Sequence, residues 1–357
     1  MPMNKTIRIG GREISEDKPA YIIAEMSGNH NMEYDRAVRI VDAAAGAGAD
    51  AVKLQTYTAD TITLDCDSEP FWISQGTLWD GMTYHKLYEK AYTPWEWQPS
   101  LRERALAEGI ELFSSPFDFS SIDFLEKMDV PAYKIASYEI TDIPLIRKAA
   151  STGKPVIIST GVAYLSDIEK ALDACRLENN EDVILLKCVS AYPTPYEDMN
   201  LRCIETLKKE FGCITGLSDH SMGSVIASAA IALGAKVIEK HMTLRRADGG
   251  VDSAFSMEPE EFAGMISDIR KVEAALGTAQ YSLTEKQLVE RGRARSLFIA
   301  ADMKAGDVFT PDNVRSVRPG NGLPPEYYYD ILGRTIRCDA SLGTPLSWDM
   351  VEGSDQD

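Results

Sequence analysis

The sequence predicts a (β/α)₈ barrel followed by a small, mostly β domain. Three observations predict this fold. Short, β-rich apolar runs alternate with helical patterns from residue 20 to about residue 277, the alternation reaches eight units, and the composition changes after about residue 283. Nearly continuous apolar runs are typical of parallel strands covered on both faces. An open doubly wound sheet is the competing fold, but no GxGxxG motif follows the first strand.

The strands of this barrel are expected in the β-rich runs at 20–27, 50–57, 110–117, 131–139, 155–161, 182–190, 213–221 and 236–244. Helical periodicity between them is clearest at 35–48, 121–128, 165–176 and 223–235. We therefore expect residues 1–283 to form the barrel domain, 284–295 to form an exposed linker, and 296–357 to form the small β domain.

Two segments of the barrel domain lie outside the repeat. Residues 1–19 predict a β-hairpin with a Gly-Gly turn that covers the barrel floor. Residues 58–93, rich in Trp and Tyr, interrupt the second unit between its strand and its helix. An insertion at that point lies on the catalytic face of a barrel. It either forms a lid or substrate wall, or is an excursion without contact to substrate.

Composition narrows the class of protein. Of the 357 residues 44% are hydrophobic and 26% charged, and the net charge of −18 argues against a nucleic-acid partner. The N-terminus has no apolar leader and no run reaches transmembrane length, so no membrane association is expected. The six cysteines form no CxxC pair, as expected of reduced thiols in the cytoplasm.

Polar residues collect where the predicted strands end, which is where a barrel of this type carries its active site. In chain order they are Glu25, Lys53, Gln55, Ser114, Ser115, Lys134, Ser137, Ser159, Thr160, Ser190, Tyr192, Ser218, His220, Glu239 and His241. Because side chains alternate across a strand, Ser218 shares a face with His220, and Glu239 with His241.

Two of the four histidines stand at neighbouring strand ends. If His220 and His241 both point inward, their neutral imidazoles suit a divalent metal such as Mn²⁺, with positions left for water or substrate. The alternative is that each histidine only forms hydrogen bonds at the end of its strand.

Lys53 and Lys134 each sit inside an otherwise apolar strand. A buried ammonium group without a partner is costly, so these lysines are expected to be paired or functional. With the surrounding hydroxyls they would form a site for phosphate or carboxylate. A Schiff-base lysine is the rival use. The sequence leaves the direction of Lys187 open, because placing Ser190 inward would turn Lys187 toward the helix layer, and Lys187 is not counted among the site residues.

Four weaker signals lie in loops. Asp252 follows the last strand, where it either binds substrate hydroxyls or forms a turn. Asn29 and His30 follow the first strand and are second-tier candidates. Arg318 stands in the glycine-rich turn RPGNG, which is a weak signal by itself.

Taken together, the motifs IIAEMSGNHN, DAVKLQTY, FSSPFD, YKIAS, ISTG, GLSDHS, EKHMTL and RPGNG resemble the sialic acid synthase family over nearly the whole chain. The resemblance implies a (β/α)₈ barrel joined to a small antifreeze-like (SAF) domain. It implies condensation of phosphoenolpyruvate with an N-acetylated amino sugar and water, giving a nonulosonic acid and phosphate. It further implies a divalent metal, most often Mn²⁺ with Mg²⁺ or Co²⁺ possible, and a domain-swapped homodimer.

The resemblance also assigns roles to matching residues. His220 and His241 would be the metal ligands. Phosphoenolpyruvate would be held by Lys53, Lys134, Ser159 and Ser218, with Ser115 and Ser137 nearby. Glu25 would orient the sugar or the attacking water, and either Glu25 or Glu239 could act on that water. The sugar would contact Tyr192, Asp252 and, from the partner subunit, Arg318.

Within the family, TLWDG, AYTPWEWQP and the SAYP after strand six are most similar to the pseudaminic acid branch. Ser190 stands where N-acetylneuraminate synthases usually carry asparagine. The expected sugar is therefore 2,4-diacetamido-2,4,6-trideoxy-L-altrose. An N-acetylneuraminate or legionaminate synthase is the closest alternative, a Schiff-base aldolase the next, and a surface-binding module without enzymatic activity the last.

Overall fold

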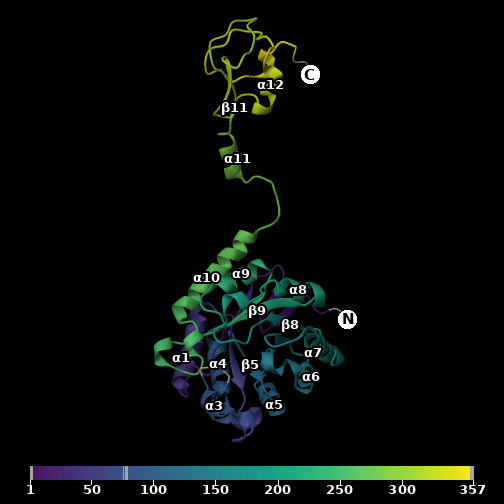
Figure 1. Cartoon of the computed structure of the whole chain (residues 1–357), viewed down its shortest axis with the longest axis vertical. Coiled ribbons are helices and arrows are strands. Elements are labelled where there is room, and N and C mark those ends of the chain that lie inside the picture. Colours follow the sequence, from purple (N-terminus) through teal and green to yellow (C-terminus); the bar gives the residue numbers. More distant parts are fainter. Residues whose placement is uncertain (1–2, 75, 77–78, 354–357) are drawn as a thin grey trace. The chain divides into compact units, whose positions relative to one another are not determined.

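A computed structural model describes residues 3–74, 76 and 79–353 of the chain. Two compact units make up the fold, Met1–Gly277 and Thr278–Asp357, and each is described here by itself (Figure 1).

The first unit is built on a closed parallel barrel. Its strands follow one another in the order β10-β3-β4-β5-β6-β7-β8-β9, so that β3 pairs with both β10 and β4 and closes the ring. The strands are β3 (Tyr21–Glu25), β4 (Ala51–Thr56), β5 (Glu111–Pro116), β6 (Tyr133–Ile135), β7 (Val156–Ser159), β8 (Val183–Lys187), β9 (Ile214–Asp219) and β10 (Val237–His241). Every predicted barrel strand is confirmed.

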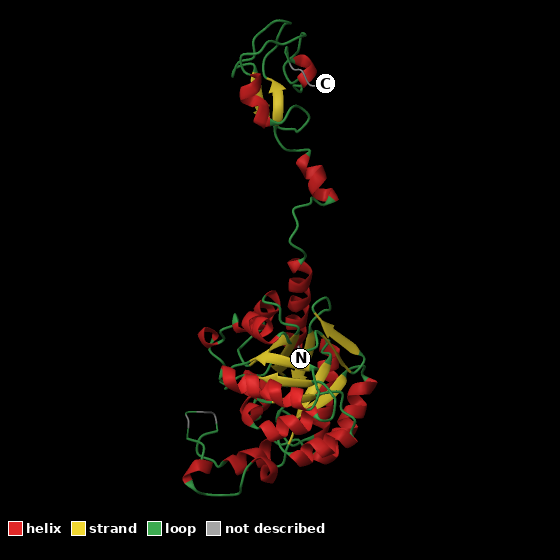
Figure 2. Ribbon diagram, turned by 90° about the vertical axis from the view of Figure 1, so that its right-hand side faces the viewer, coloured by secondary structure: helices red, strands yellow, loops and turns green. Residues whose placement is uncertain are grey.

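Helices surround the barrel on its outer side, as Figure 2 shows in red around the yellow strands. They are α1 (Tyr34–Ala47), α4 (Gln98–Ala107), α5 (Phe119–Lys127), α6 (Ile143–Ala150), α7 (Leu165–Leu177), α8 (Cys203–Phe211), α9 (Val225–Ala232) and α10 (Pro259–Leu276). Because the strands are covered on both faces, aliphatic residues of β3, β4, β7 and β8 are fully buried. None of the described helices is long and apolar enough to cross a membrane.

The N-terminal hairpin closes the floor of the barrel. Strands β1 (Thr6–Ile9) and β2 (Arg12–Ser15) are antiparallel and joined through Gly10, whose φ is 57°. Ile7, Ile9 and Ile14 are buried in one cluster with barrel residues such as Phe113. This hydrophobic contact explains why the predicted hairpin lies at the end opposite the polar strand ends.

The insertion between β4 and α4 forms two short helices, α2 (Ala59–Ile62) and α3 (Tyr84–Ala91). Thr58 caps α2 and Thr83 caps α3 by accepting hydrogen bonds from backbone N–H groups. Since the insertion follows the carboxyl end of β4, it lies on the face that carries the polar strand ends. Gln75 and, in the motif TLWDG, Thr77 and Leu78 lie outside the described residues.

The second unit has a small core of its own. Helix α11 (Glu285–Arg291) precedes an antiparallel pair, β11 (Ser296–Ile299) and β12 (Val314–Val317), and helix α12 (Tyr328–Ile331) follows. Leu297, Phe309 and Ile336 are buried in its apolar cluster. Of the predicted range 296–357, residues 354–357 lie outside the described part.

Candidate active site

The polar strand ends surround one cavity of about 780 Å³ at the carboxyl ends of the barrel strands. The cavity is lined by these predicted site residues: Glu25, Lys53, Lys134, Ser137, Ser159, Ser190, Tyr192, Ser218, His220, Glu239, His241 and Asp252. Ser115 lies just behind the lining, where its hydroxyl accepts a hydrogen bond from the Lys53 ammonium at 3.3 Å.

Strand register explains why these residues meet. Glu25 of β3 is level with Lys53 of β4 on one side and with His241 of β10 on the other. Glu239 of β10 is level with Ser218 of β9. Because alternate residues face inward, the same register turns Asp219 and Lys240 away from the cavity.

Two lysines and two glutamates form a buried network in the cavity. The Lys53 ammonium lies 2.6 Å from the Glu25 carboxylate and 3.9 Å from that of Glu239. The Lys134 ammonium also lies 3.9 Å from Glu239. Ser218 donates a hydrogen bond to Glu239 at 3.0 Å. These contacts keep the two cations close together and leave Lys134 without a tight carboxylate partner.

Burial and neighbouring charges set different pKa values in this network. Burial raises the pKa of Glu25 and lowers the pKa of Lys134. Burial opposes the charge of Glu239 too, but Lys134 and Lys53 outweigh it and lower its pKa. Burial likewise opposes the charge of Lys53, and Glu239 and Glu25 outweigh it and raise its pKa. Glu239 and Lys53 therefore hold their charges, whereas Glu25 is the carboxylate best suited to take up a proton.

A hydroxyl group next to this network suits an anion. The Ser159 hydroxyl is buried without a hydrogen-bond partner in the described part of the chain. The Ser137 hydroxyl accepts a hydrogen bond from the backbone N–H of Gly161. A Cβ atom at Gly161 would lie 2.7 Å from that hydroxyl and 2.4 Å from the hydroxyl of Ser190, so only glycine lets the three segments meet.

The two histidines stand side by side at the cavity, with ring centroids 5.2 Å apart. The Nδ1 atom of His220 lies 3.0 Å from the Val189 carbonyl oxygen, which can only accept, so Nδ1 carries the proton and Nε2 keeps its lone pair. The Nδ1 atom of His241 is buried without a partner among the described residues. Burial holds the pKa of His241 well below its ordinary value, so this ring is neutral.

This pair fits a divalent metal that takes its other ligands from substrate and water. Neutral imidazole is a good ligand for such ions. Within residues 3–74, 76 and 79–353, no group of three or more His, Cys, Asp or Glu side chains is arranged to hold an ion. The protein would thus supply two ligands, His220 and His241, and leave the remaining positions open.

The histidines are held from behind by a second buried ion pair. Lys240 lies 2.7 Å from the Asp219 carboxylate and donates to the backbone carbonyl of Ser221 at 2.7 Å. Asp219 and Lys240 directly precede His220 and His241, respectively, along the chain. The pair fixes the ends of β9 and β10 and thereby the positions of both rings.

Aromatic rings form the outer wall of the cavity. The Tyr192 ring lies 4.4 Å from that of His220 and 5.2 Å from that of Phe255. Asp252 accepts a short hydrogen bond from Ser27, and burial raises its pKa. The insertion completes this wall with Ile62, Ile73, Gly76, Trp79, Tyr84, Leu87, Tyr88 and Ala91. It is therefore a wall of the cavity, and its contact with substrate stays a prediction.

Several candidates lie outside the cavity. His30 bonds through its ring to the backbone of Met32 and to Thr93, and Asn29 joins two loops through Met242 and Ser256. Burial lowers the pKa of His30 to about 4. Both residues are structural. Lys187, whose direction the sequence left open, donates to the carbonyl of Cys188 and does not line the cavity. Exposed Arg318 lies in the second unit.

Glu139 and Cys188 line the cavity but were not singled out from the sequence. Glu139 lies on a 3-10 helix, Ser137–Thr141, where the two-residue alternation of a strand no longer applies. Burial raises its pKa to about 7. Gln55, noted only as a strand end, donates hydrogen bonds to Glu25 and Ser27. Gln55 lies two residues after Lys53 on β4 and therefore on the same face, which could have identified it from the sequence as a site residue.

Comparison with protein families agrees with this site. Residues 40–281 match the NeuB family, and residues 294–352 match the SAF domain. The chain belongs to the NeuB family. The match confirms the family resemblance that the strand-end motifs indicated, and the SAF match falls on the small β unit.

Individual relatives of this NeuB protein cover almost all of its length. It is 46% identical to a pseudaminic acid synthase of Campylobacter jejuni over 92% of this chain and 96% of that protein. It is 44% identical to the pseudaminic acid synthase of Helicobacter pylori over 94% of this chain and 99% of that protein. The crystal structure of the N-acetylneuraminic acid synthetase from Leptospira borgpetersenii, in complex with citrate, is 33% identical, with a TM-score of 0.72, and the match covers 81% of this chain and 96% of that chain.

Proposed function

We propose that this protein is a pseudaminic acid synthase, which condenses phosphoenolpyruvate with 2,4-diacetamido-2,4,6-trideoxy-L-altrose and water to give pseudaminic acid and phosphate. The observation that carries the proposal is the joint lining of one cavity by the Lys53–Lys134 pair and the His220–His241 pair. One pair suits a small dianion and the other a metal that activates an aldehyde. The similarity to two pseudaminic acid synthases supports the sugar.

The lysines would hold the phosphate and carboxylate of phosphoenolpyruvate. Lys53 and Lys134 are fully buried at the cavity floor, and the free hydroxyl of Ser159 lines the same cavity. Their charges act in a dry site, where preorganised donors stabilise developing charge more strongly than water does. Ser218 and Ser137 would complete the set of donors.

Glu25 would accept the proton that the attacking water loses. C3 of phosphoenolpyruvate would form a bond to the aldehyde carbon C1 of the sugar, while the C1=O double bond opens and its oxygen takes up a proton. Water would then add at C2 and lose a proton to Glu25. The C2–O bond to phosphate would break as the remaining C2 hydroxyl becomes a ketone and gives up its proton. Burial raises the pKa of Glu25, and its carboxylate is held by Lys53 and Gln55. Glu239, whose pKa is lowered, would balance the charge of the lysines instead.

His220 and His241 would hold a divalent ion, Mn²⁺ in our proposal, with Mg²⁺ or Co²⁺ as substitutes. When bound, the ion would supply Lewis-acid polarisation of the sugar aldehyde. Tyr192 and Asp252 line the same cavity and would contact the sugar.

Two further features belong to the proposal. Arg318 would contact the sugar from the SAF domain of the partner in a domain-swapped homodimer, which gives this exposed arginine a function. The reaction would take place in the cytoplasm, because the six cysteines, Cys66, Cys175, Cys188, Cys203, Cys213 and Cys338, are all free.

The test is phosphate release by metal-stripped protein, with and without added Mn²⁺, in the presence of phosphoenolpyruvate and one sugar at a time. We expect Mn²⁺-dependent release with the trideoxy-altrose and none with N-acetylmannosamine. Release with N-acetylmannosamine alone would assign the activity that the Leptospira relative bears in its name. Release without added metal would overturn the role of the histidines.

A Schiff-base aldolase is the second candidate, because burial lowers the pKa of Lys134, as such a lysine requires. Borohydride would then trap a covalent adduct on Lys134 when substrate is present, and EDTA would leave turnover unchanged. We expect neither result.

A further inference from the structure

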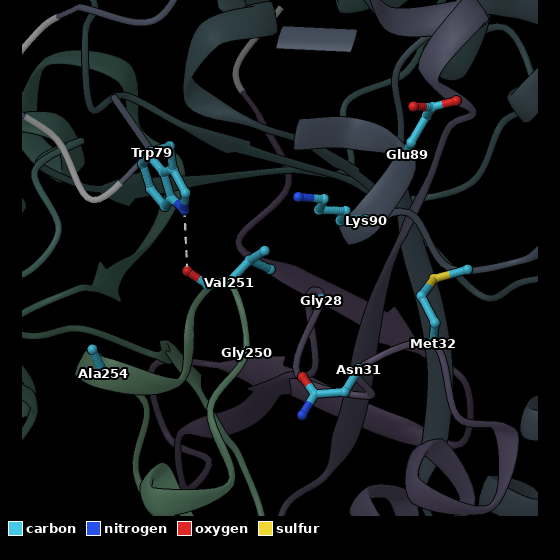
Figure 3. A pocket seen from close by; sticks show the side chains of 9 residues that line it. All are labelled: Gly28, Asn31, Met32, Trp79, Glu89, Lys90, Gly250, Val251 and Ala254. Atoms are coloured by element: carbon cyan, nitrogen blue, oxygen red, sulfur yellow. Dashed lines mark hydrogen bonds between the residues drawn. The ribbon is translucent and has the colours of Figure 1, made fainter. Parts of the chain in front are cut away.

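A second cavity opens beside the active site. It has a volume of about 630 Å³ and lies between the loop after β3, helix α3 and the loop after β10 (Figure 3). Its lining is mostly apolar, with one amide and one pair of opposite charges. The lining residues are Gly28, Asn31, Met32, Trp79, Glu89, Lys90, Gly250, Val251 and Ala254.

Trp79 and Val251 are the described residues that line both cavities. The indole N–H of Trp79 donates to the carbonyl oxygen of Val251 at 3.2 Å, as the dashed line in Figure 3 shows. This hydrogen bond joins the insertion to the loop that carries Asp252. The two side chains therefore stand where the active site borders the second cavity.

Close backbone packing keeps Val251 in place. A Cβ atom on Gly28 would lie 2.4 Å from a methyl group of Val251, and one on Gly250, whose φ is +128°, would lie 2.5 Å from the Asn31 amide oxygen. The Asn31 amide also donates to the carbonyl of Gly249. The loop after β10 thus packs directly on the loop after β3, so a larger ligand would have to displace packed atoms there.

On the proposed function, the end of the sugar that is remote from its aldehyde faces the border between the two cavities. The aldehyde would lie at the histidines. The ring of Tyr192 lies 4.4 Å from that of His220, and the ring of Trp79 lies 6.1 Å from that of Tyr192. Trp79 therefore faces the end of the sugar remote from its aldehyde. At that end the 4-acetamido group is the largest substituent of the trideoxy-altrose.

We propose that Trp79 is a specificity-determining residue that limits the length of the N-acyl group at C4 of the sugar. Its indole ring ends the subsite for the acetyl group, and the apolar second cavity lies directly behind it. Removal of the ring joins the two cavities and makes room for a longer aliphatic chain.

The test compares kcat/KM for the diacetamido sugar with kcat/KM for the analogue that carries a 4-N-butanoyl group. A single misfitting methylene in an apolar pocket changes kcat/KM by about 10- to 200-fold. We expect the wild type to prefer acetyl by at least about tenfold, and Trp79→Ala to reduce that preference by at least about tenfold. Trp79→Leu should give an intermediate ratio.

Trp72→Ala is the matched control. Trp72 belongs to the same insertion, is 41% exposed, donates to the carbonyl of Asp67, and lines neither cavity. Trp72→Ala should keep the wild-type ratio of kcat/KM between the acetyl and butanoyl sugars. This control separates the effect of removing the Trp79 ring from a general loosening of the insertion.

An unchanged ratio in Trp79→Ala overturns the inference. If both Trp79 variants are folded by circular dichroism but inactive with both sugars, the inference is also overturned, because a size limit does not abolish turnover of the smaller substrate. If the wild type releases no phosphate from the diacetamido sugar, the proposed function fails first and the inference fails with it.

Discussion

The ammonium of Lys240 lies 2.7 Å from the carboxylate of Asp219, and both side chains are essentially inaccessible to solvent. Each residue directly precedes one of the two active-site histidines. Asp219 also accepts hydrogen bonds from the backbone N–H and hydroxyl of Ser221. This ion pair therefore joins β9 to β10 on the outer side of the barrel, just behind the histidines.

Substitution Lys240→Met should destabilise the fold strongly. It leaves the Asp219 carboxylate buried without its cation, and breaking such a pair costs about 3–5 kcal/mol of the free energy of unfolding. Urea unfolding of the whole chain followed by tryptophan fluorescence measures this change. Lys236→Met, just before the same strand, removes a half-buried ammonium that donates to the carbonyl of Lys18, and should cost no more than about 1.5 kcal/mol. A loss below about 1 kcal/mol in Lys240→Met would contradict a role of the pair in stability.

Substitution Lys134→Gln should weaken use of phosphoenolpyruvate. Hydrogen bonds to charged groups contribute about 1.5–3 kcal/mol, so kcat/KM for phosphoenolpyruvate should fall by about 10- to 150-fold or more. Steady-state phosphate release at saturating sugar measures it. Lys187→Gln is the control, because Lys187 stands at the end of the next strand but one and lies outside the cavity. Equal losses in both variants would refute an anion site at Lys134.

Metal binding should weaken as the pH falls. Burial opposes a proton on His220, but contact with Cys188 outweighs burial and raises its pKa above the ordinary 6.5. A protonated imidazole has no lone pair for a metal, so Mn²⁺ affinity should be full above this pKa and decline as the pH falls through it. Equilibrium titration of Mn²⁺ followed by electron paramagnetic resonance between pH 5 and 8.5 measures the affinity. His85→Gln, a change outside the cavity, should leave this pH profile unchanged. A Mn²⁺ affinity that stays the same from pH 5 to 8.5 would contradict the two-histidine site.

Arg318 offers a direct test of the domain-swapped dimer. Arg318→Ala and Lys134→Gln should each release phosphate much more slowly than the wild type on their own. After mixing and subunit exchange, a heterodimer would contain one barrel with both an intact Lys134 and an intact Arg318 from the partner. Phosphate release should therefore reappear in the mixture. Two variants that stay inactive after verified exchange would argue for an arginine that acts within its own chain or not at all.

Much of the site could be predicted from the sequence because it follows the period of a β-strand. Inward and outward residues alternate, so Ser218 could be placed on the same face as His220, and Glu239 on the same face as His241. The eight-unit repeat, in turn, brings His220 and His241 to neighbouring strand ends. These inferences require only local periodicity and the known closure of a parallel barrel.

Other features depend on contacts between distant segments, which no local pattern contains. Glu139 faces the cavity from a 3-10 helix, and His30 turns away from it to bond with Thr93 in the insertion. The sequence does not show where the insertion lies, and only the structure brings Trp79 into contact with Val251 at the cavity wall.

The sequence by itself thus determined the barrel, its floor and the inward set of charged residues, because eight apolar β/α units close into a barrel and side chains alternate across each strand. Tertiary structure alone decided which pKa value each of these charged residues has. Lys53 and Lys134 look alike in the sequence, yet Glu239 and Glu25 together outweigh burial and raise the pKa of Lys53, while burial lowers the pKa of Lys134. Desolvation and distance set that difference, and both depend on the packing of the whole barrel.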